Sequence, residues 1–469
     1  MNPEKMISAG SGGVRARFFV MRRSETAMRY GAAEADREMF YAGAEMFSGE
    51  CDPSDVIEGL LEEHGAVCVP HLPAGLTLKR PVRLKSGIHL KVDEKTVVRM
   101  AEGCGGCMVR NWHIVSGMEG PVEAGQRDMD IIIEGGQWEE APRSASVNDP
   151  DEVIRMFGKT NILLGVAFFC HAERVTVRNM VIRSSDQYGV LLADCEDFLV
   201  EGIVFDRHRK DGVHVNGPAK RGLIQNMRGK CGDDFVALNA WDWDTSAVSF
   251  GPIEEIIVQH IECGHDEMRI LPGRKSFRSG VKIDCPVERC RFEDISGVYN
   301  FKMYQQPNCH NLKREFKDFS EIAGQIRDVF FSKIRLDCLE AEGLAEVHLD
   351  ALFEMGADCE GIVFEEIELG FSEEAFREKG MSLAIIGPKS STWTRGYTDP
   401  AEWTELFDPD MICAAEGTVF RNVRFAGEAC RNVETLLRET HLTVNEDYPN
   451  TIPRGGTGYG VIRGIRIEE

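Results

Sequence analysis

The amino-acid sequence predicts an all-β chain folded as a right-handed parallel β-helix with a short N-terminal capping helix. One observation is an internal repeat, in which alternating apolar residues lead to a polar corner and then to a second alternating run. The repeats occupy 175–194, 198–217 and 222–240. The other observation is the period, because Tyr188, Asp211 and Asp234 follow one another at intervals of 23 residues. Such repeats, without helical patterns between them, are typical of stacked coils of short strands.

The regions outside the central repeats are assigned by pattern. Pro53 stands at a predicted helix start with Asp52 as its cap, and this helix would cover the open apolar end of the first coils. Weaker repeats continue to the C-terminus. The expected division is an N-terminal extension, then the capping helix with the first strands, then the β-helix, with an insertion projecting from the last region: 1–51, 52–110, 111–469 and 372–410.

Composition limits the classes of partner. The 469 residues include 54 basic and 77 acidic side chains, and the resulting formal charge of −23 argues against binding nucleic acid through phosphates. A local basic cluster could still bind an acidic sugar, because charges act over roughly 8–10 Å at physiological salt. No run of about 18 apolar residues predicts a membrane span.

The cysteines and the N-terminus indicate a cytoplasmic protein. Residues 1–49 contain no continuous apolar stretch followed by a cleavage site, so we expect no signal peptide. The 15 cysteines are odd in number and scattered, which fits a reducing compartment better than a disulfide framework. Cys104 and Cys107 have CxxC spacing but no second pair at zinc-site distance, so we expect neither a metal nor a cofactor.

Three aspartates occupy corresponding corners of successive coils. Asp211 lies in RKDGVHVNG, and Asp233 and Asp234 lie in CGDDFVALNA. Adjacent coils are separated by roughly 4.7–4.9 Å, so these carboxylates should lie close together. Like charges at that range raise at least one pKa, which supplies a proton donor beside an ionised base, as glycoside hydrolysis requires. The alternative is that Asp-Gly and Gly-Asp-Asp are only turn residues.

Polar residues on the outer face should flank the aspartates. Alternation along the strands sends Val213 and its equivalents inward, and it sends His214, Arg269 and Lys302 outward. These three side chains indicate a site for an anionic or hydroxyl-rich ligand such as a uronate. In the alternative interpretation, Arg269 and Lys302 only offset the repulsion of the aspartates.

The lengthened turn after the aspartate pair and the next coil contribute further candidates. Trp241 and Trp243 are expected on an exposed loop, where they would stack on sugar rings or pack back on the scaffold. Asp266 is expected in register with Asp234, which would place His265 at the edge of the acidic cluster. There His265 could donate a hydrogen bond to a carboxylate or to substrate and tune the pKa of its neighbour.

These motifs resemble glycoside hydrolase family 28, the polygalacturonase-like family of the pectin-lyase-fold superfamily. The family's motifs are NTDG, GDD, GHG and RIK, in that order. RKDG, CGDD, GHD and NFK stand in their places, at 209–212, 231–234, 264–266 and 300–302. Only GDD is intact. The missing Asn and Thr before Asp211, and the missing Arg of RIK, depart from the pattern associated with galacturonate specificity.

The resemblance implies a fold and a set of roles. The fold would be a solenoid like that of pectate lyase. Asp233 would be the general acid that protonates the leaving oxygen, while Asp211 and Asp234 would activate water for an inverting displacement. His265 and Lys302 would assist and bind substrate.

We therefore expect a glycosidase whose partner is a carbohydrate, namely an oligosaccharide or glycoside such as a uronide or a galactoside. Exo-action is expected because the insertions could close one end of the cleft. One alternative is a lyase or epimerase that abstracts a proton beside a uronate carboxylate, with Lys302 as base and Ca²⁺ bound by acids. Another is a non-catalytic carbohydrate-binding spike, which could be trimeric. Whether the chain forms a homo-oligomer stays open.

Overall fold

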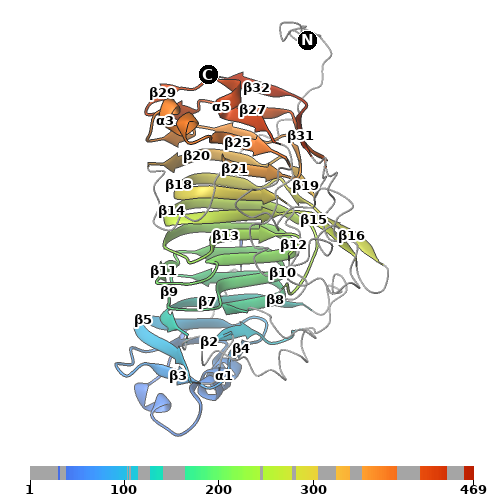
Figure 1. The fold of residues 1–469 in the computed structure, drawn as a ribbon. Helices are drawn as coiled ribbons and strands as arrows, with labels where there is room; N and C mark the ends of the chain where they lie inside the picture. Colours follow the sequence, from blue (N-terminus) through green and yellow to red (C-terminus); the bar gives the residue numbers. More distant parts are fainter. Residues whose placement is uncertain are drawn as a thin grey trace, which may run out of the picture.

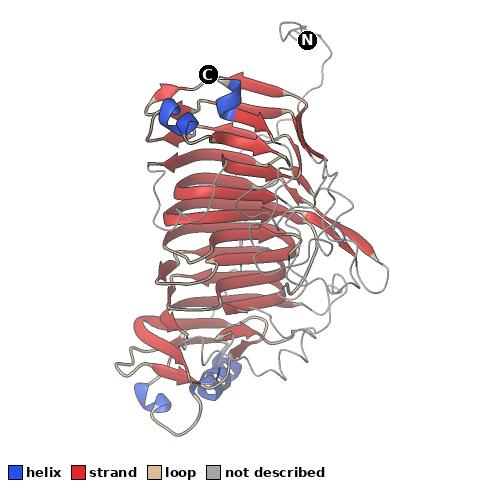
Figure 2. Cartoon of the chain, in the orientation of Figure 1, coloured by secondary structure: helices blue, strands red, loops and turns tan. Residues whose placement is uncertain are grey.

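The computed structural model describes residues 30–31, 38–102, 104, 107–114, 127–140, 164–242, 247–276, 281–304, 324–337, 351–387, 412–440 and 459–468. Nearly all the regular structure among them is β (Figure 2). The strands stack along one elongated body, with the chain advancing from one end to the other (Figure 1). Among these residues, no helix has the length and apolar character needed to cross a bilayer.

The elements of the first half begin at one end of the stack and reach its middle. They are β1 (Phe40–Tyr41), the 3-10 helix η1 (Ala44–Phe47), α1 (Pro53–His64), β2 (Ala66–Val69), β3 (Leu76–Leu78), β4 (Val82–Leu84), β5 (His89–Met100), β6 (Val109–Asn111), β7 (Asp128–Glu139), β8 (Gly165–Arg178), β9 (Val181–Arg183), β10 (Tyr188–Glu201), β11 (Val204–Asp206), β12 (Val213–Gly229) and β13 (Asp234–Asn239).

The second half continues the stack to the other end. It contains β14 (Ile253–Leu271), β15 (Gly273–Ser276), β16 (Lys282–Cys285), β17 (Val287–Glu288), β18 (Arg291–Tyr304), β19 (Gln325–Arg327), β20 (Phe330–Leu336), β21 (Ala351–Gly356), β22 (Asp358–Glu360), β23 (Val363–Glu365), β24 (Glu368–Leu369), α3 (Glu373–Glu378), β25 (Ser382–Ile386), β26 (Ile412–Glu416), β27 (Thr418–Arg421), β28 (Arg424–Phe425), β29 (Glu428–Ala429), α5 (Val433–Leu436), β30 (Leu437–Glu439), β31 (Tyr459–Ile462) and β32 (Ile465–Glu468).

Parallel pairing between successive coils organises the stack. In the centre, β8 pairs with β10, β10 with β12, β12 with β13 and β14, and β14 with β18, all in parallel. Val190 lies opposite Val213, and Val213 opposite Val236, so the 23-residue period of the sequence is the length of one coil here. These valines are buried, which confirms the predicted inward column. Parallel strands stacked coil on coil form the β-helix arrangement expected from the repeat.

The ends of the stack follow from local sequence. Helix α1 begins at Pro53, and the Asp52 side chain accepts a hydrogen bond from the Ser54 amide at 2.8 Å, which satisfies one of the otherwise unpaired amides of the first turn. Ile57 and Leu61 on its inner face are buried in the core of the first coils. The helix therefore covers the apolar end of the stack.

Part of the region expected to project belongs to the stack instead. Within 372–410, the buried run 382–386 forms β25, which pairs in parallel with β21 and is therefore part of a coil. Its side chains are all buried, which the expectation of a surface insertion did not anticipate. Residues 388–411 lie outside the described residues.

A column of charged corners runs along one edge of the stack. The corner residue of each coil has a positive φ, which lets the backbone turn sharply between strands. These residues alternate in charge from coil to coil, in the order Asp130, Arg174, Asp197, Arg221, Glu255, Arg289 and Asp328. Arg174 Nε lies 2.7 Å from Asp130 Oδ1, and Arg221 Nε lies 2.6 Å from Asp197 Oδ1. Each surface pair contributes only up to about 1 kcal/mol, but together they oppose alignments in which like charges meet.

The core of the second half is dominated by stacked phenylalanines. The ring of Phe331 stacks on Phe292 at 5.1 Å and on Phe364 at 5.4 Å between centroids, and Phe364 stacks on Phe420 at 5.0 Å. All four rings are buried. The phenylalanine rings of successive coils thus stack on one another in a continuous column that links the coils.

We expect Phe331→Ala to lower the free energy of unfolding by about 3–5 kcal/mol, because it removes a buried ring and leaves a cavity between two neighbours. Urea unfolding would measure the loss. The control is Glu378→Ala, which changes an exposed residue of α3 and should alter stability by less than about 0.5 kcal/mol. A loss below about 1 kcal/mol for Phe331→Ala would show that this column does not hold the coils together.

Candidate functional site

Three carboxylates converge at the start of two neighbouring coils. Asp211 precedes β12, while Asp233 and Asp234 stand at the start of β13. One carboxylate oxygen from each lies within 4.8 Å of the other two. The convergence follows from the 23-residue register, which places the turn before β13 directly beside the turn before β12. The structure therefore brings together the three acids that the sequence singled out.

The three carboxylates differ in their access to solvent. The side chain of Asp233 is 24% exposed, whereas those of Asp211 and Asp234 are 4% and 0% exposed. Only Asp233 of the three can therefore meet a bound molecule without rearrangement. The other two lie behind it.

A column of cations lies beside the acids. His214, Ala237, Arg269 and Lys302 follow one another in register on the outer face of β12, β13, β14 and β18, as expected from the alternation. Arg269 Nε lies 2.9 Å from Asp234 Oδ2, and its Nη2 lies 3.6 Å from Asp233 Oδ1. Lys302 Nζ lies 3.8 Å from Asp234 Oδ1 and also pairs with Glu267. The cations are thus already engaged by acids of the protein.

Burial raises the pKa values of the two hidden aspartates, Asp211 and Asp234. Burial raises the pKa of Asp234 to about 7, although Arg269 and Lys302 pull in the opposite direction. Burial and the charge of Asp233 raise the pKa of Asp211, against the opposing effect of His214. These groups interact strongly, so they titrate as one cluster that retains a proton to near neutrality.

The pKa of the exposed aspartate, Asp233, is lowered instead. Burial works to raise the pKa of Asp233, but the nearby charges of Arg269, Lys302 and Lys210 outweigh it, and the net shift is downward. Lys210 Nζ lies 3.7 Å from Asp233 Oδ2. In the free protein near pH 7, Asp233 is therefore ionised and the shared proton lies deeper in the cluster.

His214 lies between two carboxylates and is not a surface group. Its Nδ1 is 2.6 Å from Asp211 Oδ2 and its Nε2 is 3.0 Å from Asp242 Oδ2. The ring stacks on Tyr188 at 4.0 Å, and the side chain is only 1% exposed. Burial alone would lower the pKa of His214, but the two carboxylates outweigh it and raise the pKa to about 9. The expectation that His214 binds substrate does not fit this position, since both ring nitrogens are occupied.

The tryptophans of the lengthened turn were expected on its exposed surface. Trp241 is instead buried, with 1% of its surface exposed. It packs over Gly273, where a Cβ atom would come within 2.7 Å of the indole Cγ. The apolar ring therefore serves the scaffold, and the expectation that Trp241 stacks on a sugar is wrong in this structure. Trp243 lies outside the described residues.

The next coil is aligned differently from the expectation. Asp234 lies opposite Glu267 and not opposite Asp266, because the pairing of β13 with β14 is irregular between Asp234 and Val236. His265 is exposed at a positive φ of 66°, and its ring makes no hydrogen bond or ion pair with the rest of the described chain. The alignment that placed Asp266 against Asp234 is therefore wrong by one residue.

Asp266 supports the turn that holds the catalytic candidates. Its Oδ1 accepts a hydrogen bond from the Cys231 amide at 3.0 Å, and its side chain is buried. Burial raises the pKa of Asp266 to about 7. Asp242, which holds His214, was also missed as a site residue. The only signal for it was its place in an acidic and aromatic turn, WDWD, directly after the strand that begins with Asp234.

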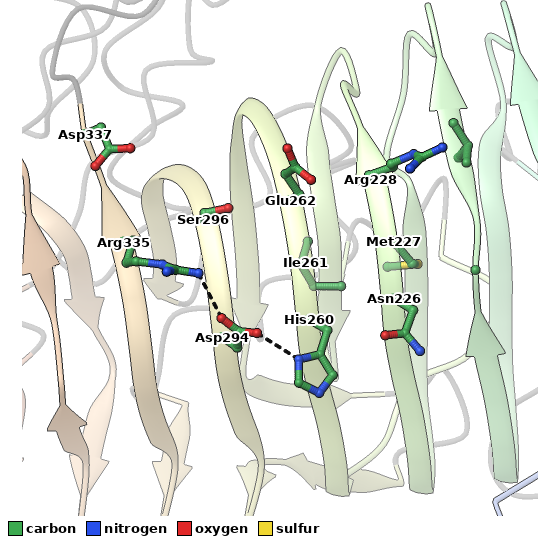
Figure 3. A pocket seen from close by; sticks show the side chains of 12 residues that line it. Asn226, Met227, Arg228, His260, Ile261, Glu262, Asp294, Ser296, Arg335 and Asp337 are labelled. Atoms are coloured by element: carbon green, nitrogen blue, oxygen red, sulfur yellow. Dashed lines mark hydrogen bonds and ion pairs between the residues drawn. The ribbon is translucent and has the colours of Figure 1, made fainter.

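A depression lies on a different stack of strands. Its cavity volume is about 860 Å³, and the residues around it come from the start of β11, the ends of β12 and β20, the middle of β14 and the first half of β18 (Figure 3). Asp294 there accepts from His260 Nδ1 at 2.9 Å and from Arg335 Nη2 at 3.1 Å. None of the three clustered aspartates borders it. We place the chemistry at the aspartates because buried, mutually perturbed carboxylates meet there, whereas the charges of this depression face solvent.

Three close carboxylate oxygens would also suit a divalent cation. Here, however, Arg269 and Lys302 already lie against the same acids and offset their charge. The donor set is therefore balanced by the chain's own side chains, and we assign no metal to it.

No protein-family model matches the chain, and no curated protein matches its sequence. Solved structures do resemble it. The catalytic domain of a GH87 α-1,3-glucanase in complex with nigerose is 9% identical, with a TM-score of 0.45, and the match covers 94% of this chain and 66% of that one. The family 28 exopolygalacturonase of Yersinia enterocolitica is 10% identical (TM-score 0.43; 93% and 79% covered), and the hyperthermoactive exopolygalacturonase of Thermotoga maritima is 12% identical (TM-score 0.46; 93% and 94% covered).

The chain thus spans just under two thirds of the glucanase domain. All three TM-scores lie below 0.5.

The raised pKa of Asp234 predicts how stability depends on pH. Between pH 4 and about 7, the folded protein keeps a proton on this group that the unfolded chain, with a carboxyl pKa of 3.8, has released. Stability from this group is therefore present at low pH and is lost as the pH rises through that window. Asp234→Asn removes the effect, so the stability of the variant relative to wild type should rise with pH by up to about 1.4 kcal/mol per unit.

Urea unfolding of both proteins at pH 4.5, 6 and 8 would measure this difference. Asp337→Asn, at an exposed position, is the matched control and should show no such trend. A pH-independent difference for Asp234→Asn would mean that Asp234 is ionised in the folded protein throughout.

Proposed function

We propose that the protein is a glycoside hydrolase in which Asp211, Asp233 and Asp234 carry out the reaction. The main support is the convergence of these carboxylates within 4.8 Å, one of them exposed and two buried. Hydrolysis of a glycosidic bond needs a proton donor and an ionised carboxylate at one place. Opposite pKa shifts within one cluster supply both states at the same pH.

Asp233 is the proposed general acid because it alone of the three reaches the surface. In the free protein it is ionised, so the role requires the shared proton to move to it when substrate binds. A sugar that covers Asp233 removes water from it, and this desolvation raises its pKa. Asp211 and Asp234 would then be the carboxylates that activate water. Lys302 and the exposed His265 are the proposed contacts to substrate hydroxyls.

The course of the reaction is also a proposal. The likeness of the motifs to family 28 favours an inverting enzyme on a right-handed β-helix, and exo-action is proposed because the insertions could close one end of the cleft. Selected oxygens of the three carboxylates lie within 4.8 Å of one another, whereas the carboxyl groups of inverting pairs are usually roughly 6.5–9.5 Å apart and those of retaining pairs roughly 5–5.5 Å apart. The configuration of the first product is therefore the measurement that separates the two courses.

The charge of the site favours a neutral sugar. A uronate carboxylate needs an available cation, but Arg269 is paired with Asp234 and Asp233, and Lys302 is paired with Glu267. Among the described residues, the other cations against the cluster are the buried His214, which is held by Asp211, and Lys210, which lies beside Asp233. We therefore propose a galactoside or other neutral glycoside in preference to a uronide.

The cysteines support the proposal that the enzyme works in the cytoplasm. All thirteen cysteines among the described residues are free thiols, and most are buried. Thiols are maintained in reducing compartments. A carbohydrate is the proposed substrate and partner.

We expect Asp233→Asn to reduce hydrolysis of neutral aryl or oligosaccharide glycosides by at least 100-fold, because the amide cannot protonate the leaving oxygen. Proton NMR of a panel of galactosides, glucosides and galacturonides would record both the rate and the anomer first released. Asp206→Asn changes a half-exposed acid on a different strand stack and should leave the rate unchanged.

Release of the inverted anomer would support the roles given above. Release of the retained anomer would support the hydrolase function but contradict the inverting mechanism. An Asp233→Asn protein with wild-type activity would remove the proposed acid, and an unsaturated product absorbing in the ultraviolet would identify a lyase instead.

A further inference from the structure

The buried histidine of the site has a defined protonation state. Asp211 faces its Nδ1 at 2.6 Å and Asp242 faces its Nε2 at 3.0 Å. A neutral imidazole carries one N–H donor, whereas the imidazolium carries two. Two ionised carboxylates at opposite ring nitrogens are both satisfied only by the imidazolium. The two carboxylates therefore favour a buried imidazolium in contact with the proposed base, while Asn216 Nδ2 also lies 3.1 Å from Nε2.

Asp242 is itself held in place by neutral donors. Asn239 Nδ2 lies 3.1 Å and Asn216 Nδ2 lies 3.3 Å from its Oδ2, and all three side chains are buried. Both asparagines occupy one outward column, because Asn216 and Asn239 are register partners on β12 and β13. Asp242 thus forms the outer end of a fixed chain that runs through His214 to Asp211.

The charged and titratable groups that face this chain come from every neighbouring element. They are Tyr188 from β10, Asp211 from the turn before β12, Asp233 and Asp234 from the start of β13, Asp242 from the turn after it, and Arg269 from β14. Tyr188 stacks on the imidazole and contributes no charge at neutral pH, since burial raises its pKa far above the usual value. The acids Asp233 and Asp234 therefore favour protonation of Asp211, and the cations His214 and Arg269 oppose it.

We propose that His214, held by Asp242, is a positioning residue that keeps Asp211 ionised and oriented as the base of the reaction. This inference rests on the proposed hydrolase function. Burial and Asp233 both favour a protonated Asp211, and a protonated carboxyl cannot accept a proton from water. The adjacent imidazolium opposes both effects, and the hydrogen bond at 2.6 Å fixes which oxygen of Asp211 is turned inward.

The decisive variant is Asp242→Asn, which keeps the size of the side chain. The amide can donate to His214 Nε2, so the ring can become neutral while its Nδ1–H still faces Asp211. Asp211 then loses its adjacent cation, and its pKa should rise. We expect the acidic limb of kcat/KM to move upward by about 1–2 pH units. At pH 5 the rate should fall about 10- to 100-fold, KM should change little, and activity should return at alkaline pH.

The matched control is His260→Gln. His260 also pairs with a carboxylate through Nδ1, at 2.9 Å from Asp294, but it is half exposed and lies on a different strand stack (Figure 3). Its loss should leave the pH profile in place. Thermal unfolding of both variants, monitored by circular dichroism, would establish that they are folded at the pH of the assay.

A second readout does not depend on turnover. Imidazole ¹⁵N shifts of His214 should report a doubly protonated ring up to about pH 8 in the wild type and a neutral ring at pH 7 in Asp242→Asn. A neutral His214 in the wild type would overturn the inference.

The outcomes separate the two proposals. A wild-type enzyme that hydrolyses glycosides while Asp242→Asn loses activity equally at every pH, or keeps its acidic limb, overturns the inference alone. A wild type that hydrolyses none of the panel overturns the proposed function, and the inference falls with it.

Discussion

The register between successive coils is the constraint on which the site depends. Because Val190, Val213 and Val236 stack in parallel, the turns before β12 and β13 meet at one place and their carboxylates converge. A slip of one residue would turn the inner column outward and separate the acids. Backbone pairing alone does not choose among alignments. Apolar packing inside and the alternating charges at the corners, such as Arg221 against Asp197, make one alignment preferable.

Collecting acids at one point has an electrostatic cost that the neighbouring column offsets. Like carboxylates at this distance repel, and burial disfavours their ionised forms. His214, Arg269 and Lys302 lie on the adjacent outward column, one on each of three coils, so each cation meets an acid from its own or a neighbouring coil. The same repeat that creates the repulsion therefore also supplies the compensation. This compensation explains how Asp211 and Asp234 can be almost completely buried at positions where apolar side chains would otherwise be expected.

Features that follow from the regular repeat could be predicted from the sequence, whereas features that depend on an interruption of the repeat could not. The period, the inward valines and the meeting of the three aspartates all follow from a regular offset, and each was predicted. The burial of Trp241, the contact of Asp242 with His214 and the pairing of Asp234 with Glu267 depend on how one lengthened turn folds back and on one irregular pairing. Periodicity has no information about either, so His214 was placed on the surface and Asp266 was aligned one residue away.

The three aspartates of the cluster look alike in sequence but differ in how deeply they are buried. Asp211, Asp233 and Asp234 share a residue type and a corner, yet only Asp233 reaches solvent, and the nearby cations shift its pKa in the opposite direction from the others. A molecule that approaches this face meets an ionised acid first and covers it, which removes its water and favours its protonation. The proton is already stored behind it, where burial holds it on Asp234. In the proposed reaction, binding and proton delivery would therefore be coupled through a single change, the loss of water at Asp233.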